Sequence, residues 1–284
     1  MYQGTISGDN PNGTDRWQIS MMEKPLDGFG QWDNLIVGGD TGHSYIVLKN
    51  PDGEIVSAMQ GAAFTPITGE FEDGAQSVAG ITGTIAHQVG LGSIFNKAAN
   101  HLGYDLNVPL LRGTVQDGPD PFLHKESGLP LIEHPILQGP EEDMRRAFAS
   151  GMDALLDINA AELMYQGIGF GRGGLTFGVN CHSLSRAVMD AMGIERGMQP
   201  DFVLKSPGKD NNLYETVPGL TRHHPDNYAH MGLAELRHHH GYQVAAVEDS
   251  LISDTLRLRV AERLKEYGQR DSQVAGINAA YTHG

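Results

Sequence analysis

The stretch that decides the fold is residues 40–61, Asp-Thr-Gly-His-Ser-Tyr-Ile-Val-Leu-Lys-Asn-Pro-Asp-Gly-Glu-Ile-Val-Ser-Ala-Met-Gln-Gly. Two runs rich in strand-forming residues, 44–49 and 54–60, flank Asn-Pro-Asp-Gly at 50–53. Such a tetrapeptide between two apolar runs is typical of a tight turn. The stretch therefore predicts a β-hairpin, and His43 begins its first strand.

Gln60 is the polar residue of the second strand that comes nearest to His43. If residues 51 and 52 form a two-residue loop, Gln60 lies opposite His43. If Gly53 instead forms a bulge, the register moves by one residue and Gln60 turns to the other face of the sheet. The sequence leaves both registers open. Asp40, three residues before His43, is the alternative partner for the imidazole.

The only cysteine of the chain, Cys181, begins a segment with helical periodicity that ends at Gly193. Its apolar residues recur at helical spacing, at Leu184, Ala187, Val188, Ala191 and Met192. Asn180 precedes the first turn and is a favoured N-cap residue. The free N–H groups and the dipole at a helix start stabilise a thiolate, so Cys181 is a candidate nucleophile. The alternative is a small buried hydrophobic residue.

A thiol nucleophile needs an imidazole that takes its proton and later gives one to the leaving group. His43 is the candidate for both steps, with Gln60 or Asp40 holding its ring in the required tautomer. The backbone N–H of Cys181, together with the side chain of Asn180 or Gln60, is the candidate oxyanion donor set. His182 is expected to be a poor partner for the thiol, because neighbouring residues do not face each other on a helix.

Two stretches of the chain carry a family resemblance. Residues 42–48, Gly-His-Ser-Tyr-Ile-Val-Leu, precede residues 180–184, Asn-Cys-His-Ser-Leu, by about 140 positions. This order resembles the circularly permuted papain-like families related to NlpC/P60, which include the lecithin:retinol acyltransferase-like and PPPDE-type thiol enzymes. Residues 206–213, Ser-Pro-Gly-Lys-Asp-Asn-Asn-Leu, resemble a later stretch of bacterial members. The chain departs from the retinol acyltransferase pattern at the orienting position, where Ile55 stands in place of a histidine.

The resemblance implies an α+β fold with a papain-like permuted core, in which an antiparallel sheet packs on the nucleophile helix, plus helical additions. It implies a cysteine hydrolase that cleaves an amide, peptide or isopeptide, through an acyl-enzyme and without a cofactor. By analogy, the activities that the resemblance implies include that of a bacterial effector amidase. Two alternatives stay open. One is an acyltransferase, lipid esterase or thioesterase on the same fold, and the other is a non-catalytic binding protein that retains it.

The resemblance implies a peptide or acyl substrate as the partner, and composition argues against other partners. The net charge of −15 disfavours nucleic acid, because a phosphate backbone would be repelled. A single cysteine forms no internal disulfide. The sequence contains no stretch of about 18 apolar residues and no basic, apolar leader, so we expect no membrane span. The expected location is the cytoplasm, or outside the cell after export by a route that needs no signal peptide.

The pattern along the chain predicts an irregular segment at 1–34, a single domain at 35–268 with a long insertion at about 61–175, and a loose tail at 269–284. Helices are expected at 85–102, from Pro140 onward and at 249–267. Residues 158–165 either extend the second of these helices or form another. The proline-rich residues 113–140 are expected to be mostly loop.

Two further features suggest other chemistry. The glycine-rich residues 167–174 resemble a dinucleotide-binding loop, but no strand precedes them and no helix follows directly, so a flexible loop is expected. His223, His224 and His230, with Asp226 and the run 238–240, contain metal-ligand residue types and keep a zinc hydrolase as a third reading. The absence of an HExxH pattern favours surface histidines, and no metal site is predicted.

Overall fold

The predicted hairpin is confirmed and forms the middle of the fold. The computed structural model describes residues 16–25, 42–65, 70–71, 110–118, 131–161, 163, 165, 169–171, 174–176, 179–204 and 209–251. In it, β2 (Gly42–Lys49) pairs with β3 (Ile55–Thr65) in antiparallel fashion. The turn between them closes with a hydrogen bond from Gly53 N–H to Asn50 O of 2.9 Å. Gly53 has a φ of 82°, a conformation that glycine adopts without strain.

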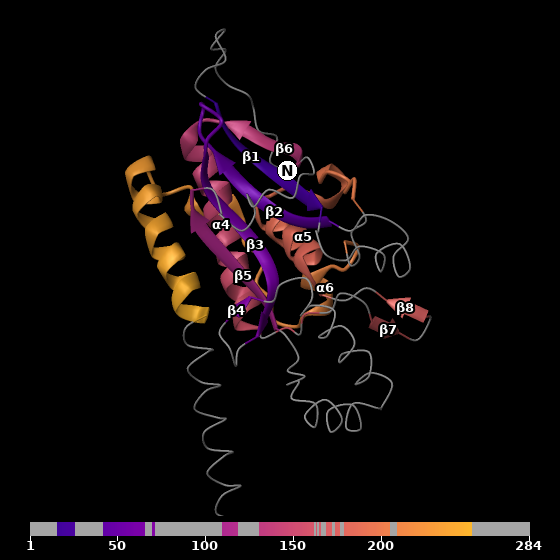
Figure 1. The fold of residues 1–284 in the computed structure, drawn as a ribbon. Coiled ribbons are helices and arrows are strands. Elements are labelled where there is room, and N and C mark those ends of the chain that lie inside the picture. Colours follow the sequence, from indigo (N-terminus) through magenta and orange to yellow (C-terminus); the bar gives the residue numbers. More distant parts are fainter. Residues whose placement is uncertain are drawn as a thin grey trace, which may run out of the picture.

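The hairpin belongs to an antiparallel sheet, and the fold is α+β as expected. The sheet adds β1 (Trp17–Pro25), β4 (Glu70–Phe71), β5 (Leu110–Asp117) and β6 (Ile132–Gly139). Its strands lie in the order β6-β1-β2-β3-β5, and the two-residue β4 pairs with the end of β3 (Figure 1). Every pairing is antiparallel.

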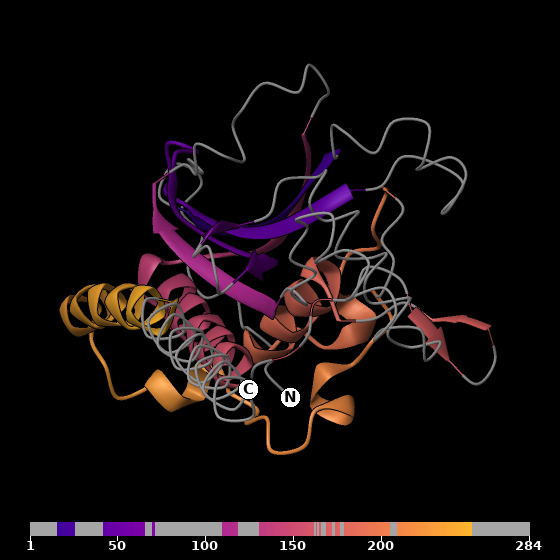
Figure 2. The ribbon, with the colours of Figure 1, turned by 60° about the horizontal axis from the view of Figure 1, so that its bottom comes forward.

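Two helices cover one face of this sheet. Figure 2 shows the curved sheet on one side and α4 (Glu141–Ala160) and α5 (Cys181–Ala191) packed beneath it. The main core lies between these layers, and its sheet residues alternate along the strands as a half-buried sheet requires. They include Ile19, Met21, Ile46, Leu48, Met59, Leu111 and Val115, packed on Phe148, Met152, Leu155, Leu184, Val188 and Met192.

Smaller elements surround the core. A short hairpin of β7 (Gly169–Gly171) and β8 (Gly174–Thr176) precedes α5. After α5 come η1 (Arg196–Met198), α6 (Leu213–Thr216) and η2 (Pro225–Tyr228). A last helix is described over residues 233–251. It is held to α4 by Gln243, whose side-chain amide donates to Ala149 O at 2.9 Å, and by two hydrogen bonds from Arg237 to Glu141.

The expected boundaries need correction. Strand β1 lies at 17–25, inside the segment expected to be irregular, and it occupies the sheet between β2 and β6. Strands β5 and β6 and helix α4 belong to the sheet and the core, although all lie within the stretch expected to be an insertion. Pro135 sits inside β6 because this strand is at the edge of the sheet, where a missing N–H costs no ladder bond.

Helix α4 begins after Pro140 as predicted and ends at Ala160. The helix expected to begin at residue 249 is wrong in its start, because the described helix already runs over 233–251. Its buried positions, Leu236, Gln243 and Val247, include a polar side chain, which interrupts the apolar periodicity. The predicted helix at 85–102 and the tail at 269–284 lie outside the described residues.

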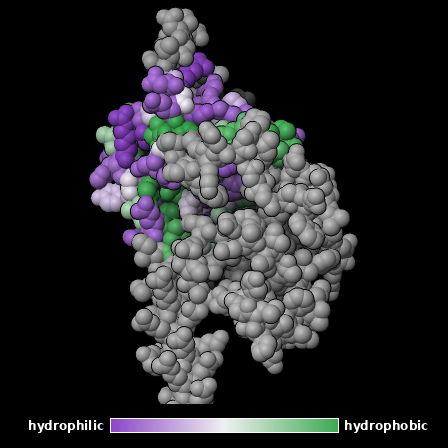
Figure 3. All heavy atoms as spheres, in the orientation of Figure 1, coloured by the Kyte–Doolittle hydropathy of each residue, from purple (hydrophilic) through white to green (hydrophobic). Residues whose placement is uncertain are grey.

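Within the described part of the chain, none of the helices combines the length and the apolar character that crossing a membrane demands. In the view of Figure 3, hydrophilic residues surround smaller hydrophobic areas on the described surface.

Glycines let the helices approach the sheet closely. A Cβ on Gly113 of β5 would lie 2.3 Å from Leu155 Cγ of α4, and one on Gly61 of β3 would lie 2.8 Å from Leu184 Cδ1 of α5. The Asn159 side chain also makes two hydrogen bonds to the Gly113 backbone. Its oxygen accepts from the Gly113 N–H at 2.6 Å, and its amide nitrogen donates to the Gly113 carbonyl at 2.9 Å. The position of α4 against β5 therefore depends on a residue without a side chain.

We expect Gly113→Ala to lower the free energy of unfolding by about 1–3 kcal/mol, because the added methyl group overpacks the contact with Leu155. Gly241→Ala is the matched control. Gly241 lies in the 233–251 helix, and an added Cβ would meet nothing within 4 Å, so its replacement should be neutral or stabilising by up to about 1 kcal/mol. Chemical denaturation measures both changes, and equal stability of the two variants would refute the close packing.

Candidate thiol site

Cys181 is the first residue of α5, as predicted, and Asn180 is its N-cap. The Asn180 side-chain oxygen accepts from the backbone N–H groups of His182 at 3.0 Å and Ser183 at 3.3 Å. Ser183 Oγ in turn accepts from the Asn180 N–H at 2.8 Å, which completes a capping box. Asn180 therefore occupies two of the donors that a free helix start would offer to an anion.

Helix α5 docks on strand β2 through two buried serines. The Oγ atoms of Ser44 and Ser185 lie 3.0 Å apart, and both side chains are fully buried. Ser185 Oγ also donates to Ser44 O at 3.3 Å, and Ser44 Oγ donates to Cys181 O at 3.4 Å. This network places the first turn of α5 against the residue that follows His43.

The thiol of Cys181 is buried, with 3 % of the residue exposed. Burial raises the pKa of Cys181 to about 11. Hydrogen bonds from the Ser44 backbone, the Tyr165 side chain and the His182 backbone act in the opposite direction and lower this pKa. This raised pKa runs against the expectation that the helix start yields a thiolate, because burial disfavours the charged form of the thiol.

His43 and Gln60 are brought together as the sequence suggested, although Gln60 pairs with Tyr45 and neither of the two predicted registers holds at this position. The His43 Nε2 and Gln60 Oε1 atoms lie 3.0 Å apart. Near the turn, Lys49 pairs with Ile55, the register that a Gly53 bulge produces. A second irregularity between Leu48 and Lys49 shifts the register once more, so Gln60 pairs with Tyr45. Two single shifts return Gln60 to the face that carries His43.

His43 and Ser44 leave β2 on opposite faces of the sheet, because side chains alternate along a strand. Ser44 faces α5, whereas His43 lies with Tyr45, whose ring stacks on the imidazole at a centroid distance of 6.2 Å. The thiol approaches the Ser44 backbone, and the imidazole leaves the strand one residue earlier on the other side. Because side chains alternate along a strand, the position of Ser44 next to His43 could have identified Ser44 as the residue that faces α5.

His182 contacts the thiol, contrary to expectation. Its Nδ1 lies 3.6 Å from Cys181 Sγ, and the residue is 3 % exposed. The imidazole and the ring of Phe202 form a T-shaped pair, with a centroid distance of 5.1 Å and an interplanar angle of 88°. Adjacent side chains on a helix do not face each other in general, but the packing of Phe202 holds this ring near the sulfur atom.

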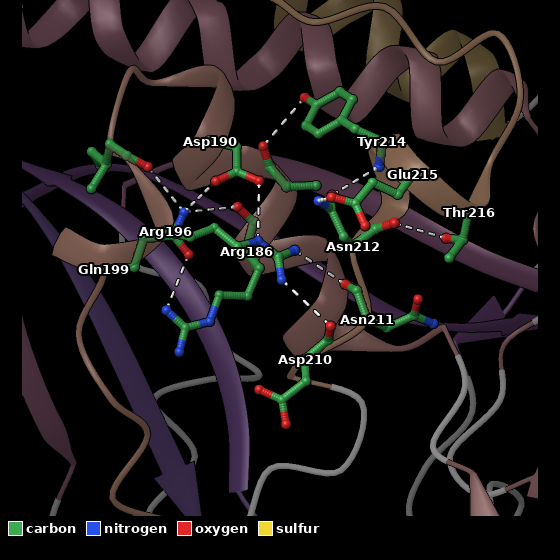
Figure 4. A network of polar contacts seen from close by, with 12 residues as sticks. Arg186, Asp190, Arg196, Gln199, Asp210, Asn211, Asn212, Tyr214, Glu215 and Thr216 are labelled. Atoms are coloured by element: carbon green, nitrogen blue, oxygen red, sulfur yellow. Dashed lines mark hydrogen bonds and ion pairs between the residues drawn. The ribbon is translucent and has the colours of Figure 1, made fainter. Parts of the chain in front are cut away.

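A polar network fixes the chain that follows α5 and carries Phe202. Arg186 donates to Gln199 Oε1 at 3.0 Å, and Gln199 donates to Asp190 Oδ1 at 2.6 Å and to Ile194 O at 3.0 Å (Figure 4). The guanidinium of Arg186 also lies over the face of Phe202, 4.7 Å from the ring centroid.

The same segment is anchored to the sheet by Glu23 of β1, which is almost fully buried. Its carboxylate accepts from the backbone N–H groups of Val203 and Leu204, each at 2.9 Å, and pairs with His134 at 2.7 Å. Leu204 then lies over Gly42, where any Cβ would come within 2.6 Å of its side chain. The residue before His43 must therefore be glycine for the segment to pass so close.

Two histidines of these clusters pair with carboxylates of the core elements. His223 Nε2 lies 2.9 Å from Asp157 of α4, and His240 Nε2 lies 2.8 Å from Asp117 of β5. The His224 ring accepts from the Asp226 N–H at 3.3 Å. Among the residues that the structure describes, no group of three or more His, Cys, Asp or Glu side chains is arranged to hold a metal ion.

The remaining sequence predictions concern Asp40, the bacterial-type stretch and the glycine-rich stretch. Asp40, the alternative partner of His43, lies outside the described residues, as do residues 206–208 of the bacterial-type stretch. The glycine-rich stretch contains the β7–β8 hairpin, which differs from the strand, loop and helix that dinucleotide binding requires. The sequence analysis did not identify Tyr165, which belongs to the stretch between β6 and α5 and reaches the thiol.

Comparison of the chain with protein family profiles, with curated protein sequences and with solved structures found no match.

We predict that Cys181 contributes to stability in a pH-dependent manner. Its pKa is raised from 9.0 to about 11 by burial, so the folded state disfavours ionisation. The contribution of Cys181 to the free energy of unfolding is fully present below about pH 9. It falls between pH 9 and 11, because the thiol of the unfolded chain releases its proton at lower pH than the thiol of the folded chain. Across this range the wild type should lose on the order of 2 kcal/mol more than Cys181→Ser, which has no titrating thiol. Urea denaturation at each pH measures the difference. Equal losses of unfolding free energy in the wild type and in Cys181→Ser would contradict a pKa raised by burial.

Proposed function

We propose that this protein is a cysteine hydrolase of the papain-like permuted type, which forms an acyl-enzyme on Cys181. The observation that carries the proposal is the pair of His43 and Gln60 at 3.0 Å on strand β2, the strand against which the helix of Cys181 docks. An amide oxygen that accepts from an imidazole N–H fixes the tautomer and the orientation of the ring. In a thiol hydrolase this is the role of the third catalytic residue, beside the nucleophile and the imidazole.

The chemistry follows from these groups. The sulfur of Cys181 attacks a carbonyl carbon, and a tetrahedral oxyanion forms. The backbone N–H of Cys181 stands at the helix start and supports the oxyanion, with the side-chain amide of Asn180 or Gln60 as second donor. In this proposal His43 takes the proton of the thiol and gives a proton to the leaving group, and it then takes a proton from the water that releases the acyl group.

The resemblance favours an amide substrate, either a peptide or an isopeptide bond, and a bacterial effector amidase is the form of this activity that we propose. The scaffold also fits transfer or hydrolysis of an acyl ester or thioester. A second candidate is a non-catalytic binding protein that retains the fold. The buried, protonated thiol of Cys181 is the specific observation that favours this second candidate.

Acylation of Cys181 separates these candidates. The full chain is incubated with p-nitrophenyl acetate, and the mass of the peptide that contains residue 181 is measured. We expect one acetyl group on Cys181 and none on Cys181→Ala. Gln60→Ala should slow turnover on the order of 10-fold, because the imidazole loses its partner.

Gln138→Ala is the matched control for the Gln60 variant. Gln138 lies on β6 and bonds Gln18 at the exposed side of the sheet, so its removal should leave turnover unchanged. A wild type that acquires no acetyl group, with Cys181 alkylated only after denaturation, would support the binding protein. Turnover of esters or thioesters but not of peptide amides would indicate the acyl-ester branch.

A further inference from the structure

We propose that residues 199–204, which we call the strap, close the site over the Cys181 thiol, and that the buried carboxylate of Glu23 holds the strap in place. A reagent or substrate reaches the sulfur atom only while the strap is released. That this release controls a reaction rests on the proposed function. Control of access to the thiol does not, and the two can be measured separately.

The thiol is closed off in this structure. Cys181 is 3 % exposed, and its neighbours Asn180 and His182 are buried to the same extent. A carbonyl carbon must come into contact with the sulfur atom before it can be attacked. Part of the molecule must therefore move before Cys181 can react with a substrate.

On the helix side, the strap contacts the residue beside the thiol. Phe202 forms its T-shaped pair with His182, and the Nδ1 atom of His182 lies 3.6 Å from Cys181 Sγ. The guanidinium of Arg186 lies over the same Phe202 ring, which also packs against the main core. Phe202 thus contacts the side chain that contacts the sulfur atom.

On the sheet side, the strap is held next to the strand on which α5 docks. Glu23 of β1 pairs with Ser44 of β2, whose hydroxyl lies 3.4 Å from the Cys181 carbonyl oxygen. One oxygen of the Glu23 carboxylate accepts from the Val203 N–H and the other from the Leu204 N–H, each at 2.9 Å. The strap therefore spans from the first turn of α5 to the sheet beside it.

The two ends of the strap are held in different ways. At its base, Gln199 is 7 % exposed and forms hydrogen bonds with Arg186, Asp190 and the Ile194 carbonyl (Figure 4). At its far end, the backbone is held by the carboxylate of Glu23. Loss of the Glu23 hydrogen bonds releases the far end while the base stays on α5. Such a local opening costs less free energy than unfolding of the whole chain.

Glu23→Gln tests the role of the carboxylate in the full chain. The amide keeps one acceptor oxygen, but it places an –NH₂ group, which cannot accept, toward the second N–H. Iodoacetamide reports access to Cys181, the only cysteine of the chain. We expect alkylation on the order of 10-fold faster than in the wild type, because a hydrogen bond to a charged group is lost.

Glu133→Gln is the matched control for the Glu23 variant. Glu133 lies on β6 and accepts from Gln18 and Ser20 of the sheet, at 2.9 and 2.8 Å. The same substitution there removes a carboxylate that does not hold the strap. The alkylation rate of Cys181 should therefore equal that of the wild type.

Gly42→Ala displaces the strap without changing the carboxylate. A Cβ at residue 42 would lie 2.6 Å from Leu204 Cδ1 and 2.8 Å from Leu204 Cβ, and rotation of the leucine side chain relieves only the first contact. We again expect alkylation on the order of 10-fold faster, because the overpacked strap must move away. Gly197→Ala is the matched control, since an added Cβ there meets nothing within 4 Å, and it should keep the wild-type rate.

Hydrogen exchange tests whether the strap and the thiol open together. The Val203 and Leu204 N–H groups exchange with solvent when they leave the Glu23 carboxylate. The protection of the thiol is the ratio of its alkylation rates in the unfolded and the native chain. We expect this ratio to equal the protection factors of the two amides. Both should be smaller than the protection that global unfolding sets, as measured by urea denaturation.

Two results would overturn the inference. One is a thiol whose protection equals that of global unfolding. The other is an unchanged alkylation rate in both Glu23→Gln and Gly42→Ala. If Glu23→Gln does not fold, Gly42→Ala and hydrogen exchange of the wild type decide the question.

Acetylation of the wild type by p-nitrophenyl acetate separates this inference from the proposed function. An acetyl group on Cys181 without coupled opening of the strap would refute the strap and support the hydrolase. Coupled opening without an acetyl group would support the strap and refute the hydrolase.

Discussion

The site depends on the buried hydrogen bond between Ser44 of β2 and Ser185 of α5. Two hydroxyl groups without access to water must satisfy each other or a backbone group, because a buried polar atom without a partner costs about 1–3 kcal/mol. Each hydroxyl lies within hydrogen-bond distance of the other and of a backbone carbonyl, Cys181 O for Ser44 and Ser44 O for Ser185, so both hydroxyl protons have partners within this network. The distance between helix and strand, and with it the place of Cys181, is therefore fixed by polar contacts at the edge of an otherwise apolar interface.

Whether the Cys181 thiol ionises depends on two opposing effects: burial, which disfavours the thiolate, and the helix start, which favours it. A helix start stabilises a negative charge by about 0.3–1 kcal/mol, and by about 2 kcal/mol in a favourable, partly buried site. The rise of the Cys181 pKa from 9.0 to about 11 corresponds to roughly 3 kcal/mol in the other direction after all donors have acted. Asn180 strengthens this outcome, because it already accepts from two N–H groups of the first turn. A helix start that is well capped is a weaker site for an anion.

The sequence predicted those parts of the fold and of the site that local chemistry determines. The hairpin turn, the Pro140 start of α4 and the Asn180 cap of α5 depend on residues close in the chain, and each is confirmed. Strand β1 was missed, because its place follows from pairing with residues up to about 120 positions away. The contact between Cys181 and His182 was missed as well, since helical spacing alone predicts that neighbouring side chains point apart. Packing of Phe202 overrides that local rule, and no pattern near the cysteine signals it.

Strand β2 thus separates two chemical environments within one residue step. On the helix side, the sulfur of Cys181 meets hydrogen-bond donors and the buried imidazole of His182, in surroundings that disfavour its ionisation. On the other side, His43 is held by an amide oxygen and stacks on Tyr45. The alternation of side chains along β2 therefore places His43 and the thiol on opposite faces of the strand, while the backbone of Ser44 still reaches the sulfur.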